Sequence, residues 1–352
     1  MTGHPLKLIL MATLVGVLVT ACESEDRTKE DLMQSSSKST PLAPPVTRIE
    51  NVVDTHWGVQ VEDPYRWLED QDSQEVLHWF EQQGGFTEQV LNALPIRGQL
   101  LERLIELDQG APYSTYGVRQ LANGDIFFLR RNAGESLAKL YHQPKGAVEA
   151  RLLLDPDALA DDADSHASIE GYMPSWEGQY LVYGVAQGGS EETTYGVIDL
   201  TSGETLSETL TNIETAYNRP QWSLNGQGFY YSRRRELPVD APDTEIYKRT
   251  EVRYHAIGTD LIADVVVAAF GVSDLLPLLE TDFPSVVITP GSSYAVLKVK
   301  HGDNNEISIF SAPVETLLTG AVPWVQIARE SDLVADFAVV ADTIYLITAK
   351  DA

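Results

Sequence analysis

The sequence G-Q-Y-L-V-Y-G at Gly178–Gly184 indicates the fold, because a glycine followed by aromatic and β-branched residues recurs along the chain. The interval is about fifty residues, and such a period with several strands in each repeat is typical of β-propeller blades. The other copies are G-D-I-F-F-L-R at Gly124–Arg130, G-Q-G-F-Y-Y-S at Gly226–Ser232, G-S-S-Y-A-V-L-K-V at Gly291–Val299 and, without the glycine, D-T-I-Y-L-I-T at Asp342–Thr348.

Two copies share a lead that ends in tryptophan, and we expect both tryptophans to lie in blade cores. The leads are Pro174-Ser175-Trp176 and Pro220-Gln221-Trp222. Turn dipeptides also precede two copies, Asn123-Gly124 and Asn225-Gly226, and an Asn-Gly pair favours a tight turn between strands. We therefore expect residues 111–352 to be mainly β, an incomplete propeller of about 4–5 four-stranded blades.

Residues 46–110 lack this repeat and are predicted to be an extended and then helical segment. Ser73 is placed to cap a helix with Val76, Leu77 and Phe80 on one face, and Gly84-Gly85 is expected to interrupt it. Pro95 precedes a second predicted helix. Its apolar stripe comprises Leu100, Leu101, Leu104 and Ile105.

The N-terminus is predicted to be a targeting signal. Lys7 precedes the apolar run Leu8–Leu18, which is too short to span a bilayer. The following Val19-Thr20-Ala21-Cys22 resembles the bacterial lipobox, in which the cysteine receives the lipid. We expect residues 1–21 to be a lipoprotein signal peptide and residues 22–45, rich in Ser, Thr and Pro, a flexible tether. Cys22 would then anchor the protein in a bacterial cell envelope, on the periplasmic side and in the outer membrane.

The composition argues against several functions. The chain has 352 residues, with 25 basic and 52 acidic side chains and a net charge of −27. Such a charge opposes nucleic-acid binding, which needs a basic surface. One cysteine excludes an intrachain disulfide. The sequence has no motif for a metal or cofactor, and Asp161–Asp164 is interpreted as an acidic turn.

Four further segments carry a resemblance to a known family. They are Asp63-Pro64-Tyr65-Arg66-Trp67-Leu68-Glu69-Asp70, Pro95-Ile96-Arg97-Gly98, Leu154-Asp155-Pro156 and Tyr254-His255-Ala256-Ile257-Gly258-Thr259-Asp260. In this order and spacing, the chain resembles the N-terminal and propeller region of the prolyl oligopeptidase family of serine peptidases. Asp63, Pro64, Tyr65, Trp67, Tyr254 and His255 match signature positions for which we expect structural roles.

The resemblance implies an enzyme of two domains. A propeller of about seven blades covers an α/β-hydrolase domain that carries Ser, Asp and His and cleaves short peptides after proline. This sequence contains no G-x-S-x-G, so a nucleophile elbow is missing. We expect the hydrolase domain to be absent, the triad to lie beyond residue 352 and this chain alone to be inactive. The partners implied are short proline-containing peptides, the missing hydrolase domain and a membrane.

Three other features of the sequence are candidate sites. Tyr217 matches a family position where an aromatic ring lines the substrate cavity, although it also fits a tyrosine of a blade loop. Gly188-Gly189-Ser190 is interpreted as a loop rather than a nucleophile, since Glu191 and Glu192 follow it. Arg233-Arg234-Arg235 offers cations for a peptide carboxylate, or a surface role. No catalytic residue is predicted in this chain. The alternative function is a lipid-anchored propeller that binds peptides or proteins without catalysis.

Overall fold

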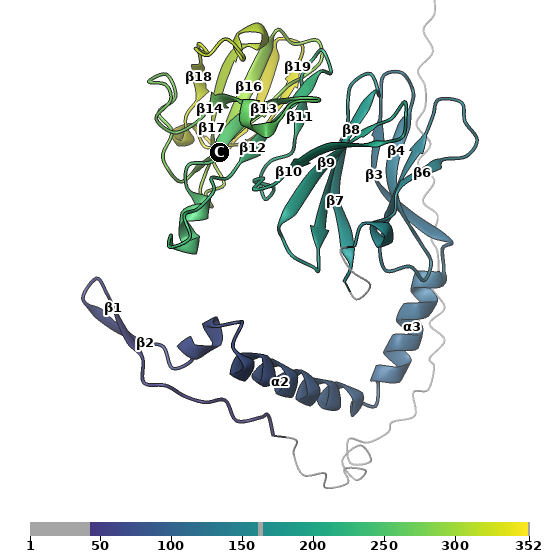
Figure 1. The fold of residues 1–352 in the computed structure, drawn as a ribbon, viewed down its shortest axis with the longest axis vertical. Helices are drawn as coiled ribbons and strands as arrows, with labels where there is room; N and C mark the ends of the chain where they lie inside the picture. The colour runs from purple at the N-terminus through teal and green to yellow at the C-terminus, as the bar shows by residue number, and fades with distance from the viewer. Residues whose placement is uncertain (1–42, 161–164, 351–352) are drawn as a thin grey trace, which may run out of the picture. The chain divides into compact units, whose positions relative to one another are not determined.

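The computed structural model describes residues 43–160 and 165–350. The predictions for the signal peptide, for Cys22 and most of the tether, and for Asp161–Asp164 lie outside the described residues. The chain forms two compact units that divide between Arg103 and Leu104. Figure 1 shows helices in the first part of the chain and antiparallel sheets in the rest.

The second unit is a succession of four-stranded antiparallel sheets followed by a two-stranded one. In each, consecutive strands are neighbours, so each sheet is a meander, the arrangement of a propeller blade. The expectation of a mainly β, partial propeller is therefore confirmed. Blade 1 holds β3 (Tyr113–Gln120), β4 (Ile126–Asn132), β5 (Lys139–Gln143) and β6 (Arg151–Leu154); blade 2 holds β7 (Ala167–Pro174), β8 (Tyr180–Gln187), β9 (Thr193–Asp199) and β10 (Thr205–Leu210). Blade 3 holds β11 (Gln221–Trp222), β12 (Gly228–Arg233), β13 (Glu251–Ala256) and β14 (Val265–Ala268); blade 4 holds β15 (Asp282–Val287), β16 (Tyr294–His301), β17 (Ile307–Pro313) and β18 (Val325–Ala328); β19 (Val334–Val340) and β20 (Thr343–Thr348) form the last hairpin.

The repeated glycine–strand motif is the turn into the second strand of each sheet, and the copies form β4, β8, β12, β16 and β20. Gly124, Gly178 and Gly226 have φ of 97°, 74° and 66°, a left-handed conformation that glycine adopts without a steric cost. In the copy that lacks the glycine, Ala341 takes the left-handed position instead, with φ of 48°. The backbone requirement thus persists after the glycine is gone.

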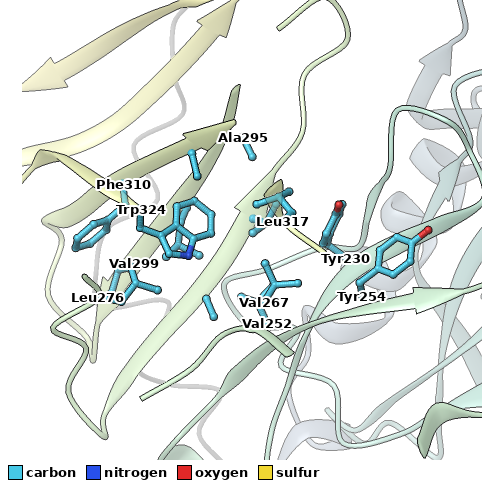
Figure 2. Close-up of a cluster of buried hydrophobic side chains, with 14 of the residues drawn as sticks. Tyr230, Val252, Tyr254, Val267, Leu276, Ala295, Val299, Phe310, Leu317 and Trp324 are labelled. Carbon is cyan, nitrogen blue, oxygen red and sulfur yellow. The ribbon is translucent and has the colours of Figure 1, made fainter. Parts of the chain in front are cut away.

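Successive blades share their apolar cores. In β8, Leu181, Tyr183 and Val185 join a cluster with blade 1, whereas Val182 points to the opposite face and joins a cluster with blade 3. Side chains alternate between the two faces of a strand, so a strand that is apolar throughout contributes to two cores. Figure 2 shows the corresponding cluster between blades 3 and 4, where Tyr230 and Val252 lie with Leu317 and Trp324.

The tryptophans of the two Pro-x-Trp leads connect blades 2 and 3. Trp222 is 1% exposed and its indole N–H donates to the carbonyl oxygen of Met173 at 2.9 Å. Trp176 is half-buried against the same cluster, and its N–H donates to the carbonyl of Trp222 at 3.3 Å. Each indole buries its ring and satisfies its polar atom on the neighbouring blade, which fixes the relative position of the two sheets.

The first unit contains a hairpin, a short 3-10 helix and a long α-helix. These are β1 (Val53–His56), β2 (Val59–Glu62), η1 (Arg66–Glu69) and α2 (Gln74–Asn92). The expectation that Gly84-Gly85 interrupts the helix is wrong, because α2 continues through both. A glycine costs only about 1 kcal/mol in a helix interior, which the rest of the helix offsets. Ser73 occupies the N-cap position without a side-chain cap bond.

The helix α3 (Arg97–Gln109) crosses the division between the two units. None of its residues is buried, and Leu100 and Leu104 of its apolar stripe are 54% and 63% exposed. Of the helices in the described residues, none is long and apolar enough to cross a membrane.

Replacing Trp222 with alanine is expected to destabilise the second unit. The change removes a fully buried ring and the hydrogen bond to blade 2, so the free energy of unfolding should fall by about 3–5 kcal/mol. Urea unfolding monitored by circular dichroism measures this. Trp57→Ala is the matched control, because Trp57 is fully exposed and should leave the midpoint unchanged. Equal midpoints for the two variants would contradict the role of Trp222.

Candidate functional site

A cavity of about 920 Å³ lies in the second unit and is bordered by blades 2, 3 and 4. Its wall comes from β7, the β8–β9 loop, the link between blades 2 and 3, and the β16–β17 turn. A space of this size accommodates a short peptide segment. The residues that line it include Glu214, Tyr217, Arg219, Arg234, Phe283 and Asp303.

The link that carries Tyr217 is a turn built around Glu214. The buried Glu214 carboxylate accepts hydrogen bonds from the backbone N–H of Ala216 at 2.9 Å and of Tyr217 at 3.2 Å. It also accepts a hydrogen bond from the Asn218 side-chain amide, which is itself buried. The Glu214 carboxylate thus satisfies the backbone N–H groups of the turn and holds Tyr217 at the cavity wall.

Tyr217 reaches from this turn to blade 4. Its hydroxyl donates to Oδ1 of Asp303 at 2.9 Å. The centroid of its ring lies 5.3 Å from the ring centroid of Phe283. Nζ of Lys298 donates to the Tyr217 carbonyl oxygen at 2.9 Å, and Lys300 lies 5.5 Å from the ring centroid. The hydrogen bond to Asp303 raises the pKa of Tyr217, so its hydroxyl remains a donor. The structure therefore places Tyr217 at the cavity; that it contacts a substrate stays a prediction.

A buried carboxylate, Glu214, and a half-buried ammonium group, Lys298, support this turn. Burial raises the pKa of Glu214, although three hydrogen bonds and the charge of Lys298 oppose the shift. Burial lowers the pKa of Lys298, and the carboxylates of Glu214 and Asp336 oppose that shift. Each charge thus favours the ionised form of the other across the seam between blades 3 and 4.

The structure also places the other candidate segments. Gly188-Gly189-Ser190 lies in the β8–β9 loop, and Gly189 and Ser190 line the cavity. Arg233, Arg234 and Arg235 each pair with a carboxylate, respectively Glu236, Glu192 and Glu245. Of these three arginines, Arg234 borders the cavity. The Arg234 charge is therefore already matched on the cavity wall.

The N-terminal signature residues lie in the first unit, where they form ion pairs and hydrogen bonds between its segments. Asp63 pairs with Arg66 at 2.6 Å, and Arg66 also pairs with Asp54 of the hairpin. The Pro64 carbonyl accepts from the N–H of Glu50, and Tyr65, 44% exposed, precedes the 3-10 helix. The Trp67 indole donates to the carbonyl of Arg48 at 3.0 Å and packs edge-on against Trp79 of α2.

Tyr254 and His255 lie on opposite faces of β13 in blade 3. Tyr254 packs in the core shared with blade 4, while His255 is fully buried and its Nδ1 lies 2.8 Å from Oδ1 of Asp264. The Tyr231 hydroxyl donates to the other oxygen of Asp264 at 2.6 Å. The hydrogen-bonded group of Tyr231, His255 and Asp264 lies within the blade, and none of the three lines the cavity.

A matching pair occurs in blade 1 that the sequence reasoning missed. His142 is the cross-strand partner of Phe127, as His255 is of Phe229, and each histidine contacts a carboxylate. The signal was present in the sequence, since Leu140-Tyr141-His142 resembles Arg253-Tyr254-His255. Sequence reasoning also missed Glu214, which is three residues from Tyr217, and Lys298 and Asp303, which lie 81 and 86 residues away and are brought to it only by folding. Among the described residues, no cluster of metal-ligating side chains is found.

The turn that carries Asp303 should respond to pH through His301. Asp282 raises the pKa of His301, and the two side chains meet at 2.8 Å. Because the folded-state pKa is raised, this stabilisation is complete below the ordinary value of 6.5 and is lost as pH rises through the folded value. His301→Asn should therefore cost more stability at pH 5.5 than at pH 8, as measured by urea unfolding. A loss that is independent of pH would contradict this assignment.

Comparison with known proteins identifies the architecture. The sequence profile described as "Prolyl oligopeptidase, N-terminal beta-propeller domain" matches residues 44–278. The prolyl endopeptidase of Elizabethkingia meningoseptica is 25% identical over 323 residues, which is 90% of this chain and 42% of that protein. The dipeptidyl aminopeptidase BI of Pseudoxanthomonas mexicana is 26% identical over 249 residues, 66% of this chain and 32% of that protein.

Solved structures agree with the sequence comparison. A structure from a study of two prolyl endopeptidases matches with a TM-score of 0.71 and 26% identity, covering 86% of this chain and 42% of that one. Prolyl oligopeptidase B from Galerina marginata, bound to a 25mer macrocyclization substrate, has a TM-score of 0.71 at 19% identity, covers 87% of this chain and 44% of that one, and supports the fold alone. This chain thus spans between about one third and just over two fifths of the length of these relatives, and its described residues hold no α/β-hydrolase domain. The chain belongs to the prolyl oligopeptidase family, of which it represents the N-terminal β-propeller region.

Proposed function

We propose that this chain is the gating propeller of a serine peptidase that hydrolyses short peptides after proline. The observation that carries the proposal is the match of residues 44–278 to the propeller domain of that family. Relatives of the chain from two Elizabethkingia species are named prolyl endopeptidases. A catalytic domain outside this chain would supply the serine nucleophile, the histidine base and the oxyanion hole.

The part of this chain in the reaction would be to admit and orient the peptide. The cavity bordered by blades 2, 3 and 4 offers the rings of Tyr217 and Phe283 as apolar surface and several charged groups at its wall. Holding a substrate in one orientation next to a catalytic group accelerates a reaction without any chemical step on the holding surface. The alternative, a propeller that binds without catalysis, is not favoured, because the relatives found are peptidases.

We further propose that the protein is anchored by lipid on Cys22 at the periplasmic side of a bacterial outer membrane. The support is in the sequence, where the apolar run Leu8–Leu18 precedes Val19-Thr20-Ala21-Cys22. Attached acyl chains would hold the protein at the membrane, since more than one chain exceeds the marginal affinity of a single one.

The peptidase proposal predicts a division of activity between this chain and a longer product. The purified 352-residue chain should not hydrolyse a chromogenic proline peptide, because its sequence holds no nucleophile elbow. A product of the same gene that includes a hydrolase domain should hydrolyse it, with loss of activity on treatment with a serine-directed inhibitor. Inhibitor-sensitive turnover by the 352-residue chain, or an inert longer product, would contradict the proposal.

The anchoring proposal predicts that Cys22→Ala releases the protein from membranes. Wild-type protein expressed in a Gram-negative host should incorporate radiolabelled palmitate and sediment with the outer membrane. The variant should do neither, because only the thiol of Cys22 can accept the lipid. Labelling that survives the substitution would contradict the assignment of Cys22.

A further inference from the structure

The charges on the cavity wall are not balanced. Arg234 pairs with Glu192, and Lys248 pairs with Glu245, which is not a lining residue. Three exposed lining carboxylates, those of Glu170, Glu191 and Asp303, form no ion pair with a cation among the described residues. Arg219 is the one lining cation of the described residues without a carboxylate partner, so these three carboxylates outnumber it.

Asp303 is the carboxylate of this set that a distant segment of the chain holds in position. Its Oδ1 accepts the Tyr217 hydroxyl at 2.9 Å, a contact between segments 86 residues apart. Asp303 is exposed, and its Oδ2 has no hydrogen-bond partner among the described residues. The ring of Tyr217 and that of Phe283 lie 5.3 Å apart on the same wall. A carboxylate beside aromatic rings provides both an ion pair and ring faces for a cation.

The nearby cations do not neutralise Asp303. Lys298 donates to the Tyr217 carbonyl oxygen and Lys300 donates to that of Asn304, and neither lysine lines the cavity. The Arg219 guanidinium donates to the carbonyl oxygen of Asn218 in its own turn at 3.0 Å. These cations are thus directed at backbone oxygens, and the surface presented to a ligand carries an excess of negative charge.

We propose that Asp303, held by Tyr217, is a specificity-determining residue that makes this cavity prefer peptides with a cationic side chain. The inference rests on the proposed peptide-binding function and names the class of substrate. A lysine or arginine side chain of the peptide would pair with Asp303, and the carboxylates of Glu170 and Glu191 would draw it toward the cavity. Fixing the carboxylate in advance reduces the ordering cost of the pair.

Binding of three matched peptides to the 352-residue chain tests this inference. The peptides share one proline-containing sequence with blocked termini and carry lysine, norleucine or glutamate at a single position, which is moved along the sequence. By calorimetry at low salt, lysine should bind about fivefold more tightly than norleucine at one position, and glutamate most weakly. The preference should shrink at about 1 M salt, where charges are screened within about 3 Å.

Asp303→Asn should remove the preference for lysine and leave the affinity for norleucine unchanged. Asp274→Asn, an exposed aspartate that does not line the cavity, is the matched control and should behave as wild type. Tyr217→Phe keeps the ring but releases Asp303, so it should reduce the preference by less than Asp303→Asn does. Circular dichroism establishes that each variant is folded.

The possible results separate the two proposals. Equal binding of lysine and norleucine peptides overturns the role of Asp303 while peptide binding stands. Tightest binding of the glutamate peptide also overturns it and assigns the site to Arg219. If none of the peptides binds to the folded chain, contact between the cavity and peptides is refuted, and the inference about Asp303 falls with it.

Discussion

The structure depends on the burial of the sheet faces that neighbouring blades share. A strand directs alternate side chains to opposite sides, so a blade with apolar residues at successive positions has two faces to remove from water. Val296 of β16 faces the last hairpin, while its neighbours Ala295 and Leu297 face blade 3. No blade can bury both faces alone, and the stability of each is therefore tied to the next.

The cavity is a consequence of this coupling. Its wall is assembled at the seams between blades, where the link before β11 meets residues of blade 4. Glu214 fixes the turn, Lys298 holds its backbone, and the hydroxyl of Tyr217 reaches Asp303. The side chains that would meet a ligand thus take their positions from the packing of whole sheets, and charge remains at the wall because the local cations satisfy backbone oxygens.

Local sequence patterns predicted the strands of the sheets, but not which distant residues contact one another at the cavity. The glycine-turn signal and strand composition located β4, β8, β12 and β16, since turn geometry and burial act over a few residues. The prediction that Gly84-Gly85 interrupts a helix was wrong, because the cost of glycine in a helix is small and the surrounding segment favours the helix. Tyr217 was singled out by resemblance, but its partner Asp303 is 86 residues away, and no local pattern predicts such a pair.

The matched Phe–His pairs of blades 1 and 3 show which part of a blade core is common to two blades and which part differs. Phe127 and His142 occupy the second and third strands of one sheet, as Phe229 and His255 do in another, with the same cross-strand register. A buried histidine needs a polar partner, and the two blades supply it from different positions: Asp125 just before β4 in blade 1 and Asp264 just before β14 in blade 3. The ring pair is thus common to both blades, while the carboxylate that satisfies the histidine can come from the strand on either side of it.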